Sequence, residues 1–296
     1  MPTVKSYNNG IAVPVYIDDA GVFRTGVISD GRTLKESLYW RGRKQRYRAV
    51  PPQTVKHWDS SEREVIYAGH IINQFGHFLL DSLSRLWFAK NKPTIPVVWM
   101  NGQNYNVWQK EILDIVGITN SAVFLERPTK FSKIHVPESG FTTELSYTAD
   151  FDNFLSRVEP SDVVLGRRCW LSRSLISRGG RVLDEAKIEL EAERMGWIVY
   201  HPEQHSVVEQ LAFLSSCENI AGWSGSAFHV MVLLKIVRPK LHILARGPHV
   251  GKLFGQIANQ KRIRQFEYVM NLELVSGSRG KAIWRSHSDI AIINLL

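Results

Sequence analysis

Short apolar runs alternate with amphipathic segments along most of the chain. After a first stretch, residues 1–60, that shows only two strand-like pieces at Ile11–Tyr16 and Val22–Val27, the alternation becomes regular. The strands predicted in this half are Val65–Gly69, Ile95–Met100, Ala122–Leu125 and Ile134–Val136. A helical period predicts one helix from His77 to Phe88 and another over Tyr105–Val116. Strands that alternate with helices favour an α/β fold with a parallel sheet covered on both faces.

A second alternating run follows Glu159-Pro160-Ser161, which has the composition of a linker. The predicted strands are Arg168–Ser172, Trp197–Tyr200, Asn219–Ala221 and Leu241–Ala245, and the predicted helices are Leu183–Met195, Val207–Ser216, Phe228–Lys235 and Leu253–Gln260. Ser206 and Glu209 have capping-box spacing at the start of one helix. We therefore predict two α/β domains, residues 1–158 and 159–296, with the last residues free to pack back on the first domain.

Composition narrows the class of protein. The chain has 296 residues, no apolar run near the ~20 residues of a membrane span, and no apolar leader at its start. Its two cysteines, Cys169 and Cys217, lie in apolar segments, as expected for buried thiols in a reducing compartment. We therefore expect a cytoplasmic protein.

The net charge of +9 suits an anionic partner: a sugar nucleotide, a nucleic acid or an acidic lipid leaflet. The densest basic run, Arg41–Arg48, is typical of a solvated loop or edge. The alternative is peripheral contact with anionic lipid headgroups at the inner membrane. No zinc pattern, recognition-helix motif or aromatic RNA-binding signature is present, so nucleic acid is not the expected partner.

The stretch Ile220–His229 is typical of a buried strand that turns at glycines into an apolar helix. At such a turn the first N–H groups of the helix and its dipole favour an anion. Gly222 and Gly225 would let the backbone approach a ligand closely. We interpret this stretch as a phosphate cradle; the alternative is a plain strand-to-helix connection.

Other charged residues follow the predicted strands of this half. Ligands bind at the carboxyl ends of the strands in open parallel sheets. Arg173, Arg178 and Arg181 follow the first of these strands and would converge with the glycine turn on a diphosphate. A carboxylate, Glu203 or Glu209, would take the hydroxyls of a ribose, although the capping box also explains Glu209.

A second candidate site lies in the first half. His77, Asp81 and Arg85 are spaced to share one helix face, directly after Gly76. The helix dipole disfavours a cationic histidine in the first turn, so His77 would stay neutral and able to accept a proton. The alternative is a surface stripe with modest pairing.

Three further interpretations rest on weaker motifs. Asp150-Phe151-Asp152 has the form of a divalent-metal motif, but N-terminal carboxylates of a helix explain it equally. His70, His77 and Asp81 are possible metal ligands by residue type, yet their spacing is not that of a known site. Ser224 as a hydrolase nucleophile lacks the second glycine of Gly-x-Ser-x-Gly and the expected order of acid and histidine.

Several blocks together resemble the glycosyltransferase 61 family over roughly residues 65–245. The blocks are Gly76–Trp87, Trp170–Ser174, Arg181–Glu185, Gly196-Trp197, His201–Glu203, Glu209-Gln210 and Gly222–His229. Two positions depart from the family pattern: Asp184 and Val230 stand where asparagine is usual.

The resemblance implies a GT-B architecture, two Rossmann-like domains facing across a cleft. It also implies transfer with inversion from a nucleotide sugar, such as a UDP-sugar, to a glycan or lipid-linked saccharide, without a bound metal or other cofactor. Bacterial relatives act in capsular polysaccharide synthesis, and eukaryotic members transfer N-acetylglucosamine or xylose. On this reading His77, with Asp81, is the catalytic base, and Asn73 and Arg85 lie on the acceptor side. The donor would meet Arg173, Arg178, Arg181, Glu203, Glu209, Gly222, Ser224, Gly225, Ser226, Ala227 and His229.

Overall fold

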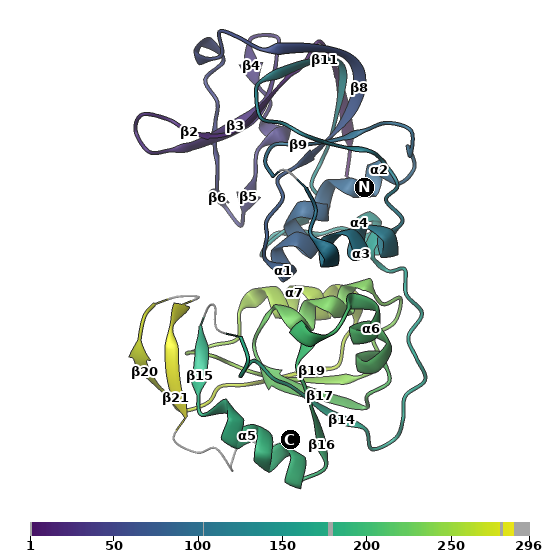
Figure 1. Cartoon of the computed structure of the whole chain (residues 1–296), viewed down its shortest axis with the longest axis vertical. Coiled ribbons are helices and arrows are strands. Elements are labelled where there is room, and N and C mark those ends of the chain that lie inside the picture. Colours follow the sequence, from purple (N-terminus) through teal and green to yellow (C-terminus); the bar gives the residue numbers. More distant parts are fainter. Residues whose placement is uncertain (1, 103, 177–179, 279–280, 287–296) are drawn as a thin grey trace. The chain divides into compact units, whose positions relative to one another are not determined.

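The structure is a computed structural model that describes residues 2–102, 104–176, 180–278 and 281–286. The chain divides into two compact units, Met1–Leu155 and Ser156–Leu296 (Figure 1). Each unit is described by itself. Among the described residues, no helix is both long enough and apolar enough to span a membrane.

The first unit is built on a nine-stranded sheet in the order β10-β9-β8-β11-β2-β3-β4, with β1 beside β11 and β7 beside β3. Its strands are β1 Val4–Asn8, β2 Ile11–Ile17, β3 Phe23–Ser29, β4 Arg32–Thr33, β7 Arg48–Ala49, β8 Asp59–Gly69, β9 Val97–Trp99, β10 Ala122–Phe124 and β11 Thr129–Pro137. Two small hairpins accompany it: β5 Trp40–Arg41 with β6 Lys44–Gln45, and β12 Phe141–Thr142 with β13 Ser146–Tyr147.

The predicted parallel sheet is present in only part of this unit. Strands β8, β9, β10 and β11 pair in parallel, as do β3 and β7, whereas the pairs β1 with β11, β11 with β2, β2 with β3 and β3 with β4 are antiparallel. The reason is local: β2 and β3 are joined by the short segment Asp18–Val22, and a parallel pair needs a crossover of a dozen or more residues. The sheet of the first unit is therefore mixed and contains a parallel segment.

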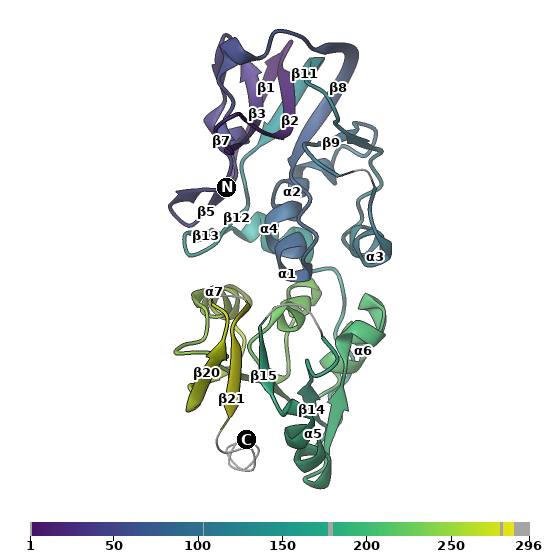
Figure 2. The ribbon, with the colours of Figure 1, turned by 60° about the vertical axis from the view of Figure 1, so that its left-hand side comes forward.

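The helices of the first unit gather at one end of this sheet (Figures 1 and 2). They are α1 Phe75–His77, α2 Leu86–Ala89, α3 Val107–Val116 and α4 Ala149–Leu155, with 3-10 turns at Lys35–Ser37 and Pro52–Thr54. The single helix predicted from His77 is interrupted by a π-helical turn, Phe78–Ser82, and a 3-10 turn, Leu83–Arg85. A π turn changes the number of residues per turn, so the i, i+4, i+8 spacing of a regular α-helix does not hold between His77 and Arg85.

The second unit contains a five-stranded sheet whose strands are all parallel, in the order β16-β14-β17-β18-β19. These strands are β14 Arg168–Leu171, β16 Trp197–Tyr200, β17 Asn219–Trp223, β18 Lys240–Leu244 and β19 Gln265–Tyr268. The chain first moves from β14 to β16 and then to β17 on the other side of β14. The direction of winding therefore reverses at β14 and β17, and in open α/β sheets a ligand binds at such a switch point.

Helices cover both faces of this sheet (Figure 1). They are α5 Glu185–Arg194, α6 Val207–Ser215 and α7 Lys252–Lys261, with 3-10 helices at Pro202–Gln204 and Ser226–Leu233. Ile188 and Ala192 of α5 pack against Trp170 and Trp223 in the main core cluster of the unit. The apolar helix predicted at Phe228–Lys235 is thus the 3-10 helix Ser226–Leu233.

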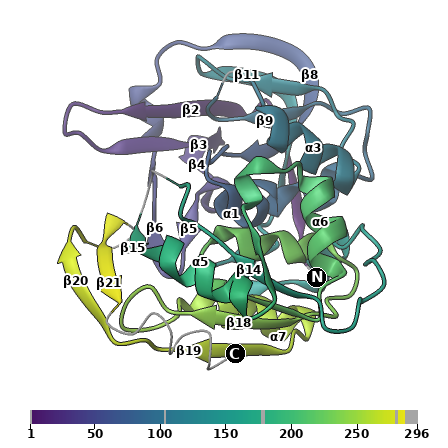
Figure 3. The same cartoon turned by 60° about the horizontal axis from the view of Figure 1, so that its bottom comes forward.

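A three-stranded sheet beside the main one was not predicted from the sequence. It consists of β15 Arg181–Leu183, β21 Ile283–Ser286 and β20 Leu272–Ser276, which lie side by side in Figure 3. Strands β15 and β21 pair in parallel although about a hundred residues separate them in the chain. Such a pairing leaves no local turn signal in the sequence.

The capping box predicted at the start of α6 is present in the structure. The Ser206 hydroxyl accepts from the Glu209 N–H at 3.2 Å, and the Glu209 carboxylate accepts from the Ser206 N–H at 2.8 Å. Ser206→Ala should lower the free energy of unfolding by about 1 kcal/mol, because a first-turn N–H loses its acceptor. Urea denaturation followed by circular dichroism measures it. Ser278→Ala, at an exposed serine outside any helix, is the control, and equal midpoints for the two variants would contradict the role.

Candidate active site

Two chain segments meet closely at the switch point of the second unit. Arg173 follows β14, and its backbone N–H donates to Oε1 of Glu185 at 3.1 Å. Gly225 follows β17, and a Cβ placed on it would lie 2.7 Å from Nη1 of Arg173. The backbone of Gly225 is extended (φ −168°), so glycine is required there for space and not for conformation. The guanidinium of Arg173 therefore lies against the glycine turn.

A second arginine, Arg246, lies at the same edge and was missed in the sequence. It follows β18; its Nε donates to the Ser224 carbonyl at 2.5 Å, and its Nη1 donates to the carbonyl of Gly180. Burial and, to a smaller extent, the charge of Arg173 lower its pKa to about 10. The available signal was its place directly after the predicted strand Leu241–Ala245, at the ligand-binding end of the sheet.

Carboxylates accompany these two arginines. Glu185, the first residue of α5, is only 3% exposed. Burial, with a smaller contribution from the charge of Glu189, raises the pKa of Glu185 to about 7. Glu203 follows β16, and its charge acts on Arg173, as does that of Glu185. Near neutral pH, Glu185 is partly protonated, so it compensates the arginines incompletely.

The glycine turn differs in detail from the predicted row of bare N–H groups. The Ser224 N–H donates to the Leu244 carbonyl at 2.7 Å, so it is not available to a ligand. Ser226 and Ala227 begin the 3-10 helix, and the first N–H groups of such a helix have no acceptor within it. Gly222 serves strand pairing: a Cβ there would lie 2.6 Å from the Leu171 carbonyl oxygen.

The remaining residues predicted for the donor lie in varied places. Arg181 is exposed in β15, and Arg178 lies outside the described residues. Glu209 caps α6, as described above. His229 is buried, with its ring 5.1 Å from that of Phe254.

The two departures from the family pattern have local explanations. Asp184 has a left-handed backbone (φ 62°), a conformation that asparagine and aspartate share as the most tolerant side chains after glycine. Val230 is fully buried in the 3-10 helix Ser226–Leu233 and contributes to the core.

In the first unit, His77 and Asp81 form a close pair. Nδ1 of His77 lies 2.6 Å from Oδ2 of Asp81, whose side chain is 4% exposed. A carboxylate only accepts, so Nδ1 carries the proton and Nε2 of the neutral ring is left as the basic atom. This arrangement has the geometry of a general base oriented by an acid.

Arg85 and Asn73, which were predicted on the acceptor side, form their hydrogen bonds with residues other than His77 and Asp81. Arg85 is 5% exposed, and its Nη2 donates to the carbonyls of Glu36 and Leu38 at 2.9 and 3.2 Å. Arg85 and Asp81 nevertheless line the same cavity, and the placement of Arg85 on the acceptor side stays a prediction. Asn73 is exposed and accepts from Nδ2 of Asn106 at 3.0 Å.

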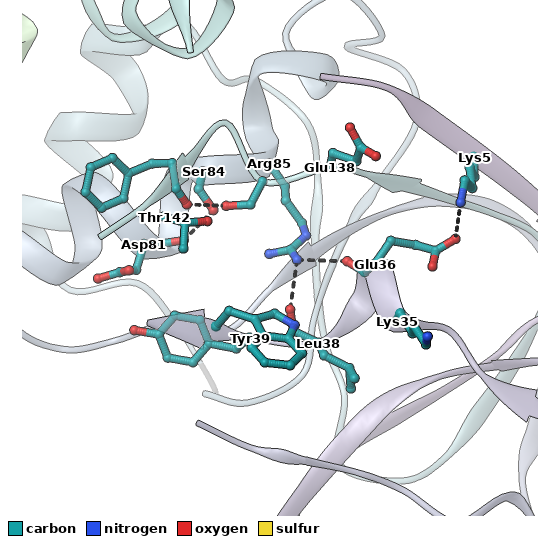
Figure 4. Close-up of a pocket in the computed structure, with 13 residues that line it drawn as sticks. Lys5, Lys35, Glu36, Leu38, Tyr39, Asp81, Ser84, Arg85, Glu138 and Thr142 are labelled. Atoms are coloured by element: carbon teal, nitrogen blue, oxygen red, sulfur yellow. Dashed lines mark hydrogen bonds and ion pairs between the residues drawn. The ribbon is translucent and has the colours of Figure 1, made fainter. Parts of the chain in front are cut away.

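A cavity of about 420 Å³ opens beside Asp81 (Figure 4). Its walls include the rings of Tyr39, Trp40 and Phe141, together with Arg85. Aromatic rings and carboxylates are the side chains that bind the apolar faces and hydroxyls of a sugar. Residues 35–40, where the sequence showed no chemistry, thus contribute part of the site.

The described part of the chain contains no group of three or more His, Cys, Asp or Glu side chains placed to hold a metal ion. Asp150 and Asp152 lie in the first turn of α4, where the helix dipole favours carboxylates, and Asp152 accepts from the Tyr147 hydroxyl at 3.2 Å. His70 is buried, and burial followed by the charge of Arg85 lowers its pKa to about 3.

The raised pKa of Glu185 makes a prediction about stability. Between the ordinary value of 4.5 and about 7, the folded state holds a proton that the unfolded state releases, so this residue's contribution to stability falls as pH rises through that window. The free energy of unfolding of Glu185→Gln should not show this fall. At the upper end of the window it should therefore exceed that of wild type by up to about 3 kcal/mol. Urea denaturation at several pH values measures the difference. Glu193→Gln, an exposed change in the same helix, should run parallel to wild type; a parallel curve for Glu185→Gln would refute the assignment.

The family model described as glycosyltransferase 61 matches residues 75–244, more than half of the chain. This range contains His77 and Asp81, Arg173, Glu185 and the glycine turn. No curated protein matches the chain. The chain therefore belongs to the glycosyltransferase 61 family, and it is a glycosyltransferase.

Proposed function

We propose that this glycosyltransferase moves a sugar, with inversion, from a UDP-sugar to a glycan or glycolipid acceptor in the synthesis of a surface polysaccharide. The observation that carries the donor half of the proposal is the contact of Arg173 with Gly225 at the switch point of a parallel sheet. Cations and helix N–H groups at this edge are the partners that a diphosphate needs. Family membership supports the reaction class.

In this proposal the diphosphate lies at the edge formed by Arg173, Arg246 and the N–H groups of Ser226 and Ala227. Arg246 replaces the Ser224 N–H in the set predicted from the sequence. Glu203, which lies close enough to Arg173 for their charges to interact, would accept from the ribose hydroxyls. Fixed cations at this position stabilise the charge that develops on the departing diphosphate, and such stabilisation is usually the largest contribution to catalysis.

The acceptor would react at the His77–Asp81 pair. The acceptor hydroxyl oxygen attacks the anomeric carbon while the bond from that carbon to the diphosphate oxygen breaks. The hydroxyl proton passes to Nε2 of His77, and UDP leaves with the bonding electrons. Asp81 holds the ring through Nδ1, at 2.6 Å, and stabilises the cation that forms. The cavity beside Asp81 would receive the acceptor sugar.

The proposal includes a GT-B arrangement, in which both units contribute to one reaction, and no requirement for a metal. It places the protein in the cytoplasm, where thiols stay reduced; Cys169 and Cys217 are both buried and free. A non-catalytic nucleotide-sugar or glycan-binding protein is the alternative. The departures that motivated it, Asp184 and Val230, have structural explanations, so they no longer favour it.

His77→Ala should abolish most turnover while leaving the affinity for UDP nearly unchanged. Loss of a general base typically lowers the rate by about a hundredfold to ten-thousandfold. The rate is measured as transfer or donor hydrolysis with a panel of nucleotide sugars, and UDP affinity by calorimetry. His57→Ala, at an exposed histidine of the same unit, is the matched control. Turnover that survives in His77→Ala would remove this residue from the mechanism.

Gly225→Ala should weaken UDP binding by about tenfold or more, because the new Cβ displaces the guanidinium from the diphosphate position. A flexible side-chain end has room to move, so the fold should be retained. Gly255→Ala is the control: a Cβ there meets nothing within 4 Å. The shift of the melting temperature with UDP measures both. Equal UDP-induced shifts in the two variants would argue against the proposed diphosphate position.

A further inference from the structure

The cavity beside Asp81 contains a buried cation that has no acidic partner. The guanidinium of Arg85 lines the cavity and donates only to main-chain carbonyls, those of Glu36 and Leu38 (Figure 4). Its Nε is buried without a hydrogen-bond partner, and its charge lies 5.4 Å from the centre of the Tyr67 ring. Among the described residues, Arg85 forms no ion pair. Buried charges are normally paired with an opposite charge, so this one is available to an anion.

The acids that line the same cavity already have partners. Asp81 bonds His77, and Glu36 lies 3.3 Å from Nζ of Lys5. Glu138 accepts from the Thr3 N–H at 2.9 Å. Asp81 and Glu138 bond an imidazole and a main-chain N–H and so keep their charges, but none of the three acids is bonded to Arg85.

A basic hairpin adds to this charge. Strands β5 and β6 pair Arg41 with Lys44, and the Arg46 N–H donates to the Tyr39 carbonyl at 2.9 Å. Side chains alternate along a strand, so Arg41, Lys44 and Arg46 share the face of Tyr39. Gly42, with φ 58°, lies in the tight turn that makes this pairing possible.

Tyr39 connects the hairpin with the cavity. Its ring lines the cavity, and its hydroxyl lies close enough to Asp81, Arg41 and Arg46 to sense their charges. Burial is the largest cause of the raised pKa of Tyr39; Asp81 raises it further, and both arginines lower it. Neither Arg41 nor Arg46 forms an ion pair within the described ranges 2–102 and 104–176 or elsewhere in the described chain. The hairpin that carries Arg41 and Arg46 therefore adjoins Tyr39 and Trp40, which line the cavity.

We propose that the acceptor saccharide carries an anionic group, a carboxylate or a phosphate, and that Arg85, Arg41 and Arg46 bind it in this cavity. The inference rests on the proposed function, because it identifies the acceptor's chemistry at the position next to the His77–Asp81 pair. It also gives the run Arg41–Arg48 a defined role in place of a solvated loop.

Calorimetry with the full chain tests the proposal using three probes: methyl glucuronide, glucose 6-phosphate and the neutral methyl glucoside. We expect at least one anionic sugar to bind about tenfold or more tightly than methyl glucoside, because charge-assisted bonds are the strong ones. Tighter binding of the glucuronide would identify a carboxylate, and tighter binding of the phosphate a phosphate. The preference should shrink as the salt concentration rises.

The double variant Arg41→Gln/Arg46→Gln should lose about tenfold in affinity for the anionic sugar and none for methyl glucoside. Arg63→Gln/Arg127→Gln removes the same charge at exposed positions away from the cavity and should bind as wild type does. Equal affinity for all three probes, no binding of an anionic sugar, or an unaffected double variant would overturn the proposal.

Two further readouts separate this inference from its alternatives. Sedimentation with phosphatidylglycerol vesicles tests the lipid surface; hairpin-dependent binding to them with unchanged sugar affinity would assign the hairpin to a membrane and overturn the acceptor role. UDP-induced thermal stabilisation reports on the second unit alone. If UDP raises the melting temperature but no anionic sugar binds, this inference is refuted and the donor proposal is not. If an anionic sugar binds but UDP causes no shift, the proposed donor is refuted and the inference about the cavity is not.

Discussion

The close approach of Arg173 to Gly225 is possible because no side chain occupies position 225. The approach is fixed by the parallel pairing of β14 with β17, in which Leu171 lies opposite Gly222. There too the absence of a Cβ lets the strands come together. Two glycines thus have different functions in one short stretch: one allows the sheet to form at its switch point, and the other leaves room for a cation at its edge.

Nearby carboxylates balance the positive charge at this edge only in part. Arg173 and Arg246 lie near each other, which costs free energy, and their nearby carboxylate Glu185 is buried enough for its pKa to approach 7. Main-chain carbonyls, such as that of Ser224, hold Arg246 without neutralising it. A doubly charged diphosphate would complete the compensation. The same residues would therefore be more stable with the donor bound than without it.

The sequence predicted the second unit better than the first, for a physical reason. Parallel strands joined by helices have local sequence signals. Apolar runs, the capping box at Ser206 and the glycine after Leu183–Met195 all lie within a few residues of the elements they define. Pairings between distant segments leave none, so β15 with β21 was missed. Arg246 was missed because a single charged residue after a strand carries no motif. In the first unit, helical periodicity cannot reveal a π turn, so the interruption of the predicted helix after His77 was missed.

Arg85 and Arg246 are held in the same way. Each guanidinium is held by main-chain carbonyls contributed by segments far away in the chain, Glu36 and Leu38 in one case and Gly180 and Ser224 in the other. Carbonyl oxygens position a guanidinium but leave its net charge in place, unlike a carboxylate partner. A fold that buries cations in this way lowers its own stability while it has no ligand. Retaining two such cations, each at a proposed substrate position, is consistent with a transferase whose donor and acceptor both carry negative charge.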